Sequence, residues 1–249
     1  MNTGKYLAAR LAARVLGLLI SRDEPSRGTR VLMYHDVITG TEQSDIYSLP
    51  VAKFAEGISS LARWAFDHDH PFVPLSPVPQ PGIAITFDDG YSSTLALAAP
   101  ILSEHAIPFH VFATKSFVES GDRRYLTPIE LQRLADLPGA SLGIHGETHT
   151  RFTELDEDTL RRELSTTRDW LEQLIQRPVS SLSYPHGSFT PRTRRTVEAS
   201  GFTIAACSKI GTFTSPEQTW RVPRIDIWSY DDRTSTIGKT RGDWDSLLP

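Results

Sequence analysis

The chain has 249 residues, of which 39% are hydrophobic and 22% are charged, and this is enough for one large domain with a substantial core. Its 26 basic and 30 acidic side chains give a net charge of -4, which argues against nucleic acid or another polyanion as a partner. The single cysteine, Cys207, excludes an internal disulfide and a Cys-x-x-Cys metal site.

The N-terminal segment, residues 1–29, joins a basic, apolar stretch to a polar connector. Arg10 and Arg14 interrupt the apolar residues, so the uncharged run falls far short of the roughly 20 residues that span a bilayer. We expect an amphipathic helix that packs on the domain or contacts a membrane surface through residues 1–20. Because no clear export signal is present, we expect a cytoplasmic location, with an atypical signal sequence as the alternative.

Strand-like and helix-like segments alternate along the rest of the chain. In chain order we expect a strand at 30–35, a helix at 51–66, a proline-rich connector at 71–82, a strand at 83–87, a helix at 93–106, a strand at 109–114, a helix at 127–137, a strand at 140–145, a helix at 156–176, a strand at 179–184, a helix at 191–200, and strands at 202–207 and 224–228. Such alternation predicts parallel strands with crossover helices, in a barrel or an open sheet. No G-x-G-x-x-G follows the first strand, which argues against a dinucleotide-binding sheet.

Polar residues collect where four of the predicted strands end. His35 ends the first strand, Asp88 and Asp89 follow the second, His145 ends a later one, and residues 184–186 follow another. Parallel strands have their carboxyl ends on one face, and barrel enzymes place their catalytic residues there. We therefore expect these side chains to share one site.

A metal hypothesis starts from "HGETH", residues 145–149. Two histidines four residues apart face the same way if the backbone turns helically, although such a pair can also cap a helix or face solvent. Two imidazoles and one aspartate from another strand suit zinc or a similar divalent ion and leave coordination positions open for water and substrate.

The neighbouring aspartates of "TFDDG", residues 86–90, have two explanations. An Asp-Gly pair after a strand commonly forms a turn. Alternatively, one aspartate coordinates the ion and the other accepts a proton from the metal-bound water, whose pKa a divalent ion lowers towards about 7. The positive charge of the ion would then offset the repulsion between the two carboxylates.

Three motifs in this order resemble those of the polysaccharide deacetylase family, also called carbohydrate esterase family four: "TFDDG", then His-x-x-x-His, then "SYPHG". The resemblance covers about residues 30–228. It implies a distorted (β/α) barrel of about seven parallel strands, a single domain over residues 30–249, and a divalent metal ion, zinc or alternatively nickel, cobalt or iron. It further implies removal of acetyl groups from N-acetylated sugars.

Carried over by position, Asp88 resembles the general base of the family, and Asp89, His145 and His149 resemble its metal ligands. Gly146 stands where serine or threonine is typical, which removes a supporting hydrogen bond. The third motif lacks its usual arginine, yet a backbone N–H near His186 can still stabilise the oxyanion, because this contribution does not depend on the side chain.

Members with Tyr-Pro-x-Gly in the third motif often begin with a Tyr-His strand and end with an arginine before an apolar strand, as "LMYHDV" and "VPRIDI" do here. In such members His35 resembles the general acid, and Arg224 replaces the absent arginine by orienting Asp88. The structural alternatives are a buried strand-end histidine for His35 and a surface ion pair for Arg224.

The sequence therefore predicts a metal-dependent hydrolase that deacetylates N-acetylated sugar residues of a polysaccharide or its precursor, in the making of a cell-surface polysaccharide. Asp88, His35, Arg224 and His186 are the predicted catalytic residues. The alternatives are an O-acetyl esterase or deformylase that acts on sugars, and a non-catalytic barrel that binds glycan.

Overall fold

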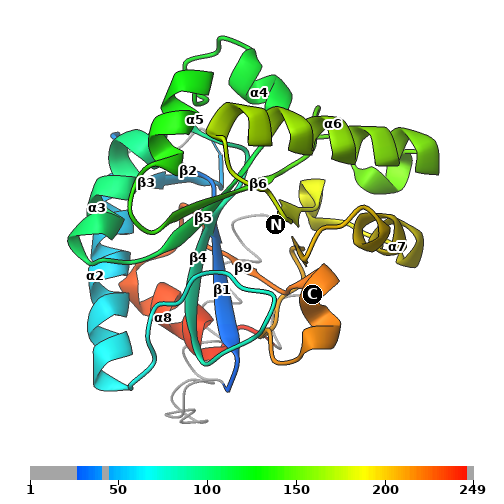
Figure 1. Ribbon diagram of the computed structural model, residues 1–249. Helices are drawn as coiled ribbons and strands as arrows, with labels where there is room; N and C mark the ends of the chain where they lie inside the picture. Colours follow the sequence, from blue (N-terminus) through cyan, green and yellow to red (C-terminus); the bar gives the residue numbers. More distant parts are fainter. Residues whose placement is uncertain (1–26, 41–44, 246–249) are drawn as a thin grey trace.

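The computed structural model describes residues 27–40 and 45–245, and a seven-stranded parallel sheet forms its frame (Figure 1). The strands lie in the order β8-β7-β6-β5-β4-β1-β9. Their bounds are β1 (Thr29–Tyr34), β4 (Gly82–Phe87), β5 (Phe109–Ala113), β6 (Ala140–Ile144), β7 (Ser181–Ser183), β8 (Ile204–Ala206) and β9 (Ile225–Asp226). All seven predicted strands are present, and the expected single-domain α/β barrel is confirmed.

A short segment, residues 222–226, brings the two edges of the sheet together. Val222 forms a parallel bridge with Ala206 of β8, and three residues later Ile225 of β9 pairs with Leu32 of β1. The N–H of Val222 also donates to the carbonyl of Ala205 at 2.9 Å. The sheet therefore curls into a distorted barrel, in which a single bridge and a two-residue strand join the edges.

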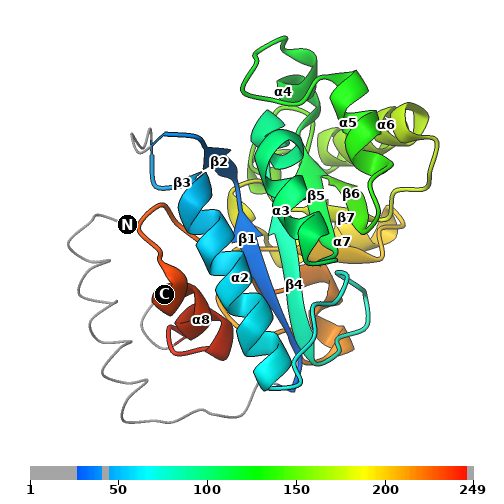
Figure 2. The same cartoon turned by 90° about the vertical axis from the view of Figure 1, so that its left-hand side faces the viewer.

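Helices cover the outer face of the curled sheet (Figure 2). Their bounds are α2 (Val51–Asp67), α3 (Ala99–Glu104), α4 (Lys115–Glu119), α5 (Pro128–Ala135), α6 (Glu157–Ile175), α7 (Pro191–Ala199) and α8 (Arg233–Arg241). The predicted helix at 93–106 divides into a π-helical turn, Thr94–Ala98, and α3, in which Pro100 lies in the first turn. The sequence analysis missed α4, α8 and a two-stranded parallel sheet of β2 (Asp36–Ile38) and β3 (Ser48–Pro50).

Alternation along the strands divides the apolar residues between two cores. Leu32 and Tyr34 of β1 face the helices and belong to the larger core, whereas Val31 faces the inside of the barrel. The inner core is small and consists of Val31, Ala84, Phe112, Ile204, Ala206, Phe213 and Val222. Phe112 belongs to this inner core, and a methyl group added to Gly143 of the adjacent strand would approach its ring to 2.7 Å.

The predicted amphipathic helix in residues 1–20 lies outside the described residues, as does most of the expected linker up to residue 29. Within residues 27–40 and 45–245, every helix is too short or too polar to cross a membrane.

Phe112→Ala tests the inner core, because it would leave a cavity that the surrounding strands cannot fill. We expect the free energy of unfolding to fall by about 3 to 5 kcal/mol in urea titrations. Phe66→Ala is the matched control, because the Phe66 side chain is 88% exposed, and its effect should stay within about 0.5 kcal/mol. Equal losses in the two variants would contradict the assignment of Phe112 to the core.

Candidate metal centre and active site

The carboxyl ends of three strands place the predicted site residues at one end of the barrel. His35 follows β1, Asp88 and Asp89 follow β4, and His145 follows β6. The strands β1, β4, β5 and β6 are consecutive neighbours in the sheet, so their ends lie together (Figure 1). The sequence pattern predicted that these segments come together, and the structure shows that they do.

Asp89, His145 and His149 form a cluster whose three ligand atoms lie within 4.8 Å of one another. Oδ1 of Asp89 is 3.3 Å from Nε2 of His149 and 3.5 Å from Nε2 of His145. Oδ1 is buried, yet it accepts no hydrogen bond from the described residues. A buried carboxylate oxygen without a donor is costly unless a cation binds it, so this atom fits a metal ligand.

The surroundings of His145 and His149 favour an imidazole nitrogen that can bind a metal ion. The Nδ1 atom of His145 is 2.9 Å from the carbonyl oxygen of Ser183, which can only accept, so Nδ1 carries the proton and Nε2 is free. Burial, followed by the neighbouring His145, lowers the pKa of His149 to about 4 and keeps it neutral at pH 7. Two imidazoles and one carboxylate are the donor set of a catalytic zinc site, so the residues present fit such an ion.

The condition that the backbone turns helically between the two histidines is not met. Residues 145–149 form an irregular loop, in which Gly146 has φ +82° and His149 has φ +61°. These left-handed conformations, rather than a helical repeat, bring the imidazole rings to a centroid separation of 4.9 Å.

The Asp88–Asp89 pair is separated by its backbone. Asp89 has φ +72° and the N–H of Gly90 donates to the carbonyl of Asp88 at 3.0 Å, which closes a tight turn. Successive side chains consequently point to different partners: Asp89 to the histidines and Asp88 to Arg224. The expected turn is therefore present, and it divides the two carboxylates; their roles as metal ligand and base stay a prediction.

Asp88 and Arg224 form a buried, bidentate ion pair. Nη1 of Arg224 donates to Oδ1 at 2.7 Å and Nη2 donates to Oδ2 at 2.8 Å, and both side chains are at most 4% exposed. Ser183 joins them, because its hydroxyl accepts from Arg224 at 2.7 Å and donates to Asp88 at 3.0 Å. The structure thus places Arg224 in the interior rather than at the surface.

The charge of Asp88 follows from this pairing. Burial alone would raise the pKa of Asp88, but the Arg224 guanidinium and then His145 outweigh it and hold the pKa well below its ordinary value. Oδ2 of Asp88 also lies 3.7 Å from Nε2 of His145, so this carboxylate lies next to the group of Asp89, His145 and His149.

His35 lies beside Tyr47, with ring centroids 4.4 Å apart. Its Nδ1 atom is buried and finds no hydrogen bond among the described residues, and the same holds for Oδ1 of Asp226 on β9. Burial raises the pKa of Asp226, and the charge of His35 is the largest influence in the opposite direction. Sequence reasoning missed Asp226 and Ser183; the signal for Asp226 was its place two residues after Arg224, on a strand end.

His186 lies beside His149, in the short turn Pro185–Gly187. Its φ is +56° and its ring centroid is 4.4 Å from that of His149. It is outside the group of Asp89, His145 and His149 that could hold an ion. The role of its backbone N–H stays a prediction.

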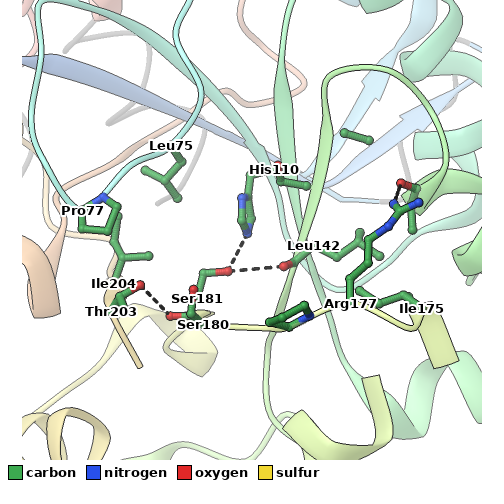
Figure 3. Close-up of a pocket in the computed structure, with 14 residues that line it drawn as sticks. Leu75, Pro77, His110, Leu142, Ile175, Arg177, Ser180, Ser181, Thr203 and Ile204 are labelled. Atoms are coloured by element: carbon green, nitrogen blue, oxygen red, sulfur yellow. Dashed lines mark hydrogen bonds between the residues drawn. The ribbon is translucent and has the colours of Figure 1, made fainter. Parts of the chain in front are cut away.

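A separate cavity of about 300 Å³ lies at the opposite end of the barrel, where β5 to β8 begin (Figure 3). His110, which the sequence analysis left without a role, points into it and lies 2.8 Å from the Ser181 hydroxyl. Burial lowers the pKa of His110 to about 3, so the pair is neutral. None of the predicted catalytic or metal-binding residues lines this cavity.

Arg224→Met should be strongly destabilising, because it leaves Asp88 buried without its partner. We expect a loss of about 3 to 5 kcal/mol in the free energy of unfolding, with much of it recovered in the double variant with Asp88→Asn. Arg221→Met, at an exposed position, is the control and should change stability by less than about 0.5 kcal/mol. A loss in the double variant equal to the sum of the losses in Arg224→Met and Asp88→Asn alone would refute the coupling, and urea unfolding measures the wild type and all four variants.

One protein of similar sequence and two solved structures of similar fold relate this chain to known proteins. YxkH of Bacillus subtilis (strain 168), which is named as a polysaccharide deacetylase, is 21% identical over 220 residues, covering 84% of this chain and 74% of YxkH. The structure of the Streptococcus pyogenes deacetylase PplD in complex with acetate superposes with a TM-score of 0.73 at 16% identity, covering 87% of this chain and 99% of PplD. IcaB from Ammonifex degensii gives a TM-score of 0.69 at 18% identity, covering 89% of this chain and 98% of IcaB.

A family profile gives the assignment. The profile described as polysaccharide deacetylase matches residues 76–205, just over half of the chain, and this range contains the Asp88–Asp89 turn, both metal-site histidines and the Tyr-Pro-His-Gly motif. The chain belongs to the polysaccharide deacetylase family.

Proposed function

We propose that the protein is a metal-dependent hydrolase that removes acetyl groups from N-acetylated sugar residues of a polysaccharide or of its biosynthetic precursor. The observation that carries this proposal is the cluster of Asp89, His145 and His149 beside the ionised Asp88. Membership of the family supports a sugar substrate, and PplD, a deacetylase of the same fold, was solved with acetate, the product of such a reaction.

Asp89, His145 and His149 would hold the ion, and zinc suits this donor set best. When bound, a divalent ion supplies a water of lowered pKa and polarises the acetyl carbonyl. Ser183 fixes the ring of His145 through its carbonyl, so this ligand is oriented before the ion arrives.

The chain's own residues divide the proton transfers. Arg224 keeps Asp88 ionised, and Asp88 accepts a proton from the attacking water. At the same time the water oxygen forms a bond to the acetyl carbon. The carbon–nitrogen bond then breaks, and His35 gives its proton to the departing nitrogen, so that acetate and an amino sugar leave. A backbone N–H at His186 would stabilise the negative charge that develops on the carbonyl oxygen.

Acetate release from short N-acetylglucosamine oligomers tests the reaction. We expect release by the zinc-loaded protein, loss after chelation and recovery with added Zn²⁺, and a fall of about 10²- to 10⁴-fold in kcat for Asp88→Asn. Release only from O-acetylated xylan oligomers would favour an esterase instead. Binding of the oligomers without any acetate release would favour a glycan-binding barrel.

The leaving group tests His35. An amine departs poorly unless it is protonated, whereas 4-nitrophenolate departs without help. We therefore expect His35→Ala to lower kcat on N-acetylglucosamine oligomers by about 10²- to 10⁴-fold and to change hydrolysis of 4-nitrophenyl acetate far less. His105→Ala is the matched control, because His105 lies at the end of α3, away from the carboxyl ends of the strands. Equal losses on both substrates would show that His35 is not the acid.

A further inference from the structure

The loop that carries both histidine ligands, residues 145–149, has no regular backbone pairing of its own. Two of its residues, Gly146 and His149, have left-handed φ values. His145 and Gly146 are buried, whereas Thr148 is exposed, and an irregular backbone keeps one conformation only where its N–H and C=O groups have fixed partners. The groups that satisfy this loop therefore determine whether the two imidazoles meet.

The N–H groups of Glu147 and Thr148 are satisfied by a side chain from a helix, whereas that of His145 donates to the carbonyl of Ala113. Glu163 lies in the second turn of α6, and its side chain is buried although it is a carboxylate. Its Oε1 accepts from the N–H of Glu147 at 3.0 Å, and the N–H of Thr148 also donates to this carboxylate. Hydrogen bonds from amides to an ionised carboxylate are stronger than those to a neutral group.

The carbonyl groups of the loop are satisfied from another side. At the start of α4, the N–H of Lys115 donates to the carbonyl of Gly146 at 3.2 Å and that of Ser116 donates to the carbonyl of Glu147 at 2.8 Å. Lys115 also forms an ion pair with the Glu147 side chain at 2.9 Å. The two helices α4 and α6 contact each other, and α6 also packs against β6 (Figure 1). The loop is thus held between two helices.

Gly146 makes room for the Glu163 carboxylate. A methyl group on Gly146 would lie 3.0 Å from Oε1 of Glu163 and 3.2 Å from the ring of Phe152. The missing side chain and the φ of +82° let the carboxylate approach the loop closely enough to accept from the two amides that follow. Burial raises the pKa of Glu163, and the amides act in the opposite direction. A buried carboxylate that serves only backbone amides has a positioning role here.

We propose that Glu163 is a positioning residue that fixes the loop of residues 145–149 in its metal-binding conformation before any ion is bound. The inference rests on the proposed function, in which His145 and His149 are ligands. Glu163 touches neither substrate nor ion; it acts through the backbone between the two histidines.

Glu163→Gln in the full-length protein tests this role, because the amide keeps the size of the side chain but removes its charge and leaves one acceptor oxygen in place of two. We expect Zn²⁺ binding, measured by competition with a chromophoric chelator, to weaken by about 10- to 100-fold. Glu157→Gln, an exposed position on the same helix, is the matched control and should leave affinity within about twofold of wild type. Wild-type affinity in Glu163→Gln would overturn the proposal.

Hydrogen exchange provides a second measurement that needs neither activity nor a variant. In the metal-free wild type, we expect the amides of Glu147 and Thr148 to be protected, with little change when Zn²⁺ is added. Protection that arises only with Zn²⁺ would mean that the ion, and not Glu163, orders the loop. If Asp89→Asn binds Zn²⁺ as tightly as wild type, the metal assignment of the proposed function fails, while the exchange data still decide the role of Glu163.

Discussion

Two adjacent carboxylates in a buried site are tolerable only if each has its own positive partner, and the structure is organised around this requirement. Asp88 has the Arg224 guanidinium, delivered from the segment that joins the two edges of the sheet. Asp89 has an oxygen that accepts no hydrogen bond from the described residues and faces the imidazoles of His145 and His149. The three ligand atoms of Asp89, His145 and His149 lie within 4.8 Å of one another, so a cation bound there would compensate this second carboxylate. The tight turn at Asp89 therefore separates a permanent ion pair from an ion-binding site.

The barrel closure and the site depend on each other. Val222 bridges to β8 and Ile225 pairs with β1, and Arg224 lies between them in the chain. The same few residues therefore close the sheet and bring the guanidinium into contact with Asp88. The N–H of Arg224 also donates to the carbonyl of Lys209, and its Nε atom donates to that of Cys207. A two-residue strand is weak by itself. The ion pair to Asp88 adds a strong, directional contact across the inside of the barrel at this point.

Much of the framework could be predicted from local pattern. Buried parallel strands show as short apolar runs, and α5 begins at Thr127 with the capping box that its sequence indicates. α8 could not be predicted in this way, because its buried residues are mainly polar, including Lys239, which pairs with Asp231 inside the molecule. Periodicity detects apolar faces, so a helix that packs through hydrogen bonds and a buried ion pair gives no such signal. β2 and β3 escaped for a different reason: three-residue strands are too short to show alternation.

The same limit applies within the site. Residue identity and order along the chain pointed to Asp88, Asp89, His145, His149 and Arg224, but not to the groups that orient them. Ser183 acts through its backbone carbonyl as well as its hydroxyl, and a carbonyl is present at every position, so no sequence pattern marks it. Glu163 lies 14 residues beyond His149, on a helix whose exposed face carries other acidic residues, and only its burial distinguishes it. A helical interpretation of the His145–His149 spacing failed because the loop takes its hydrogen bonds from α4 and α6 rather than from itself. The ligands of a metal site can be found from their chemistry, whereas the groups that hold those ligands in place are determined by tertiary contacts.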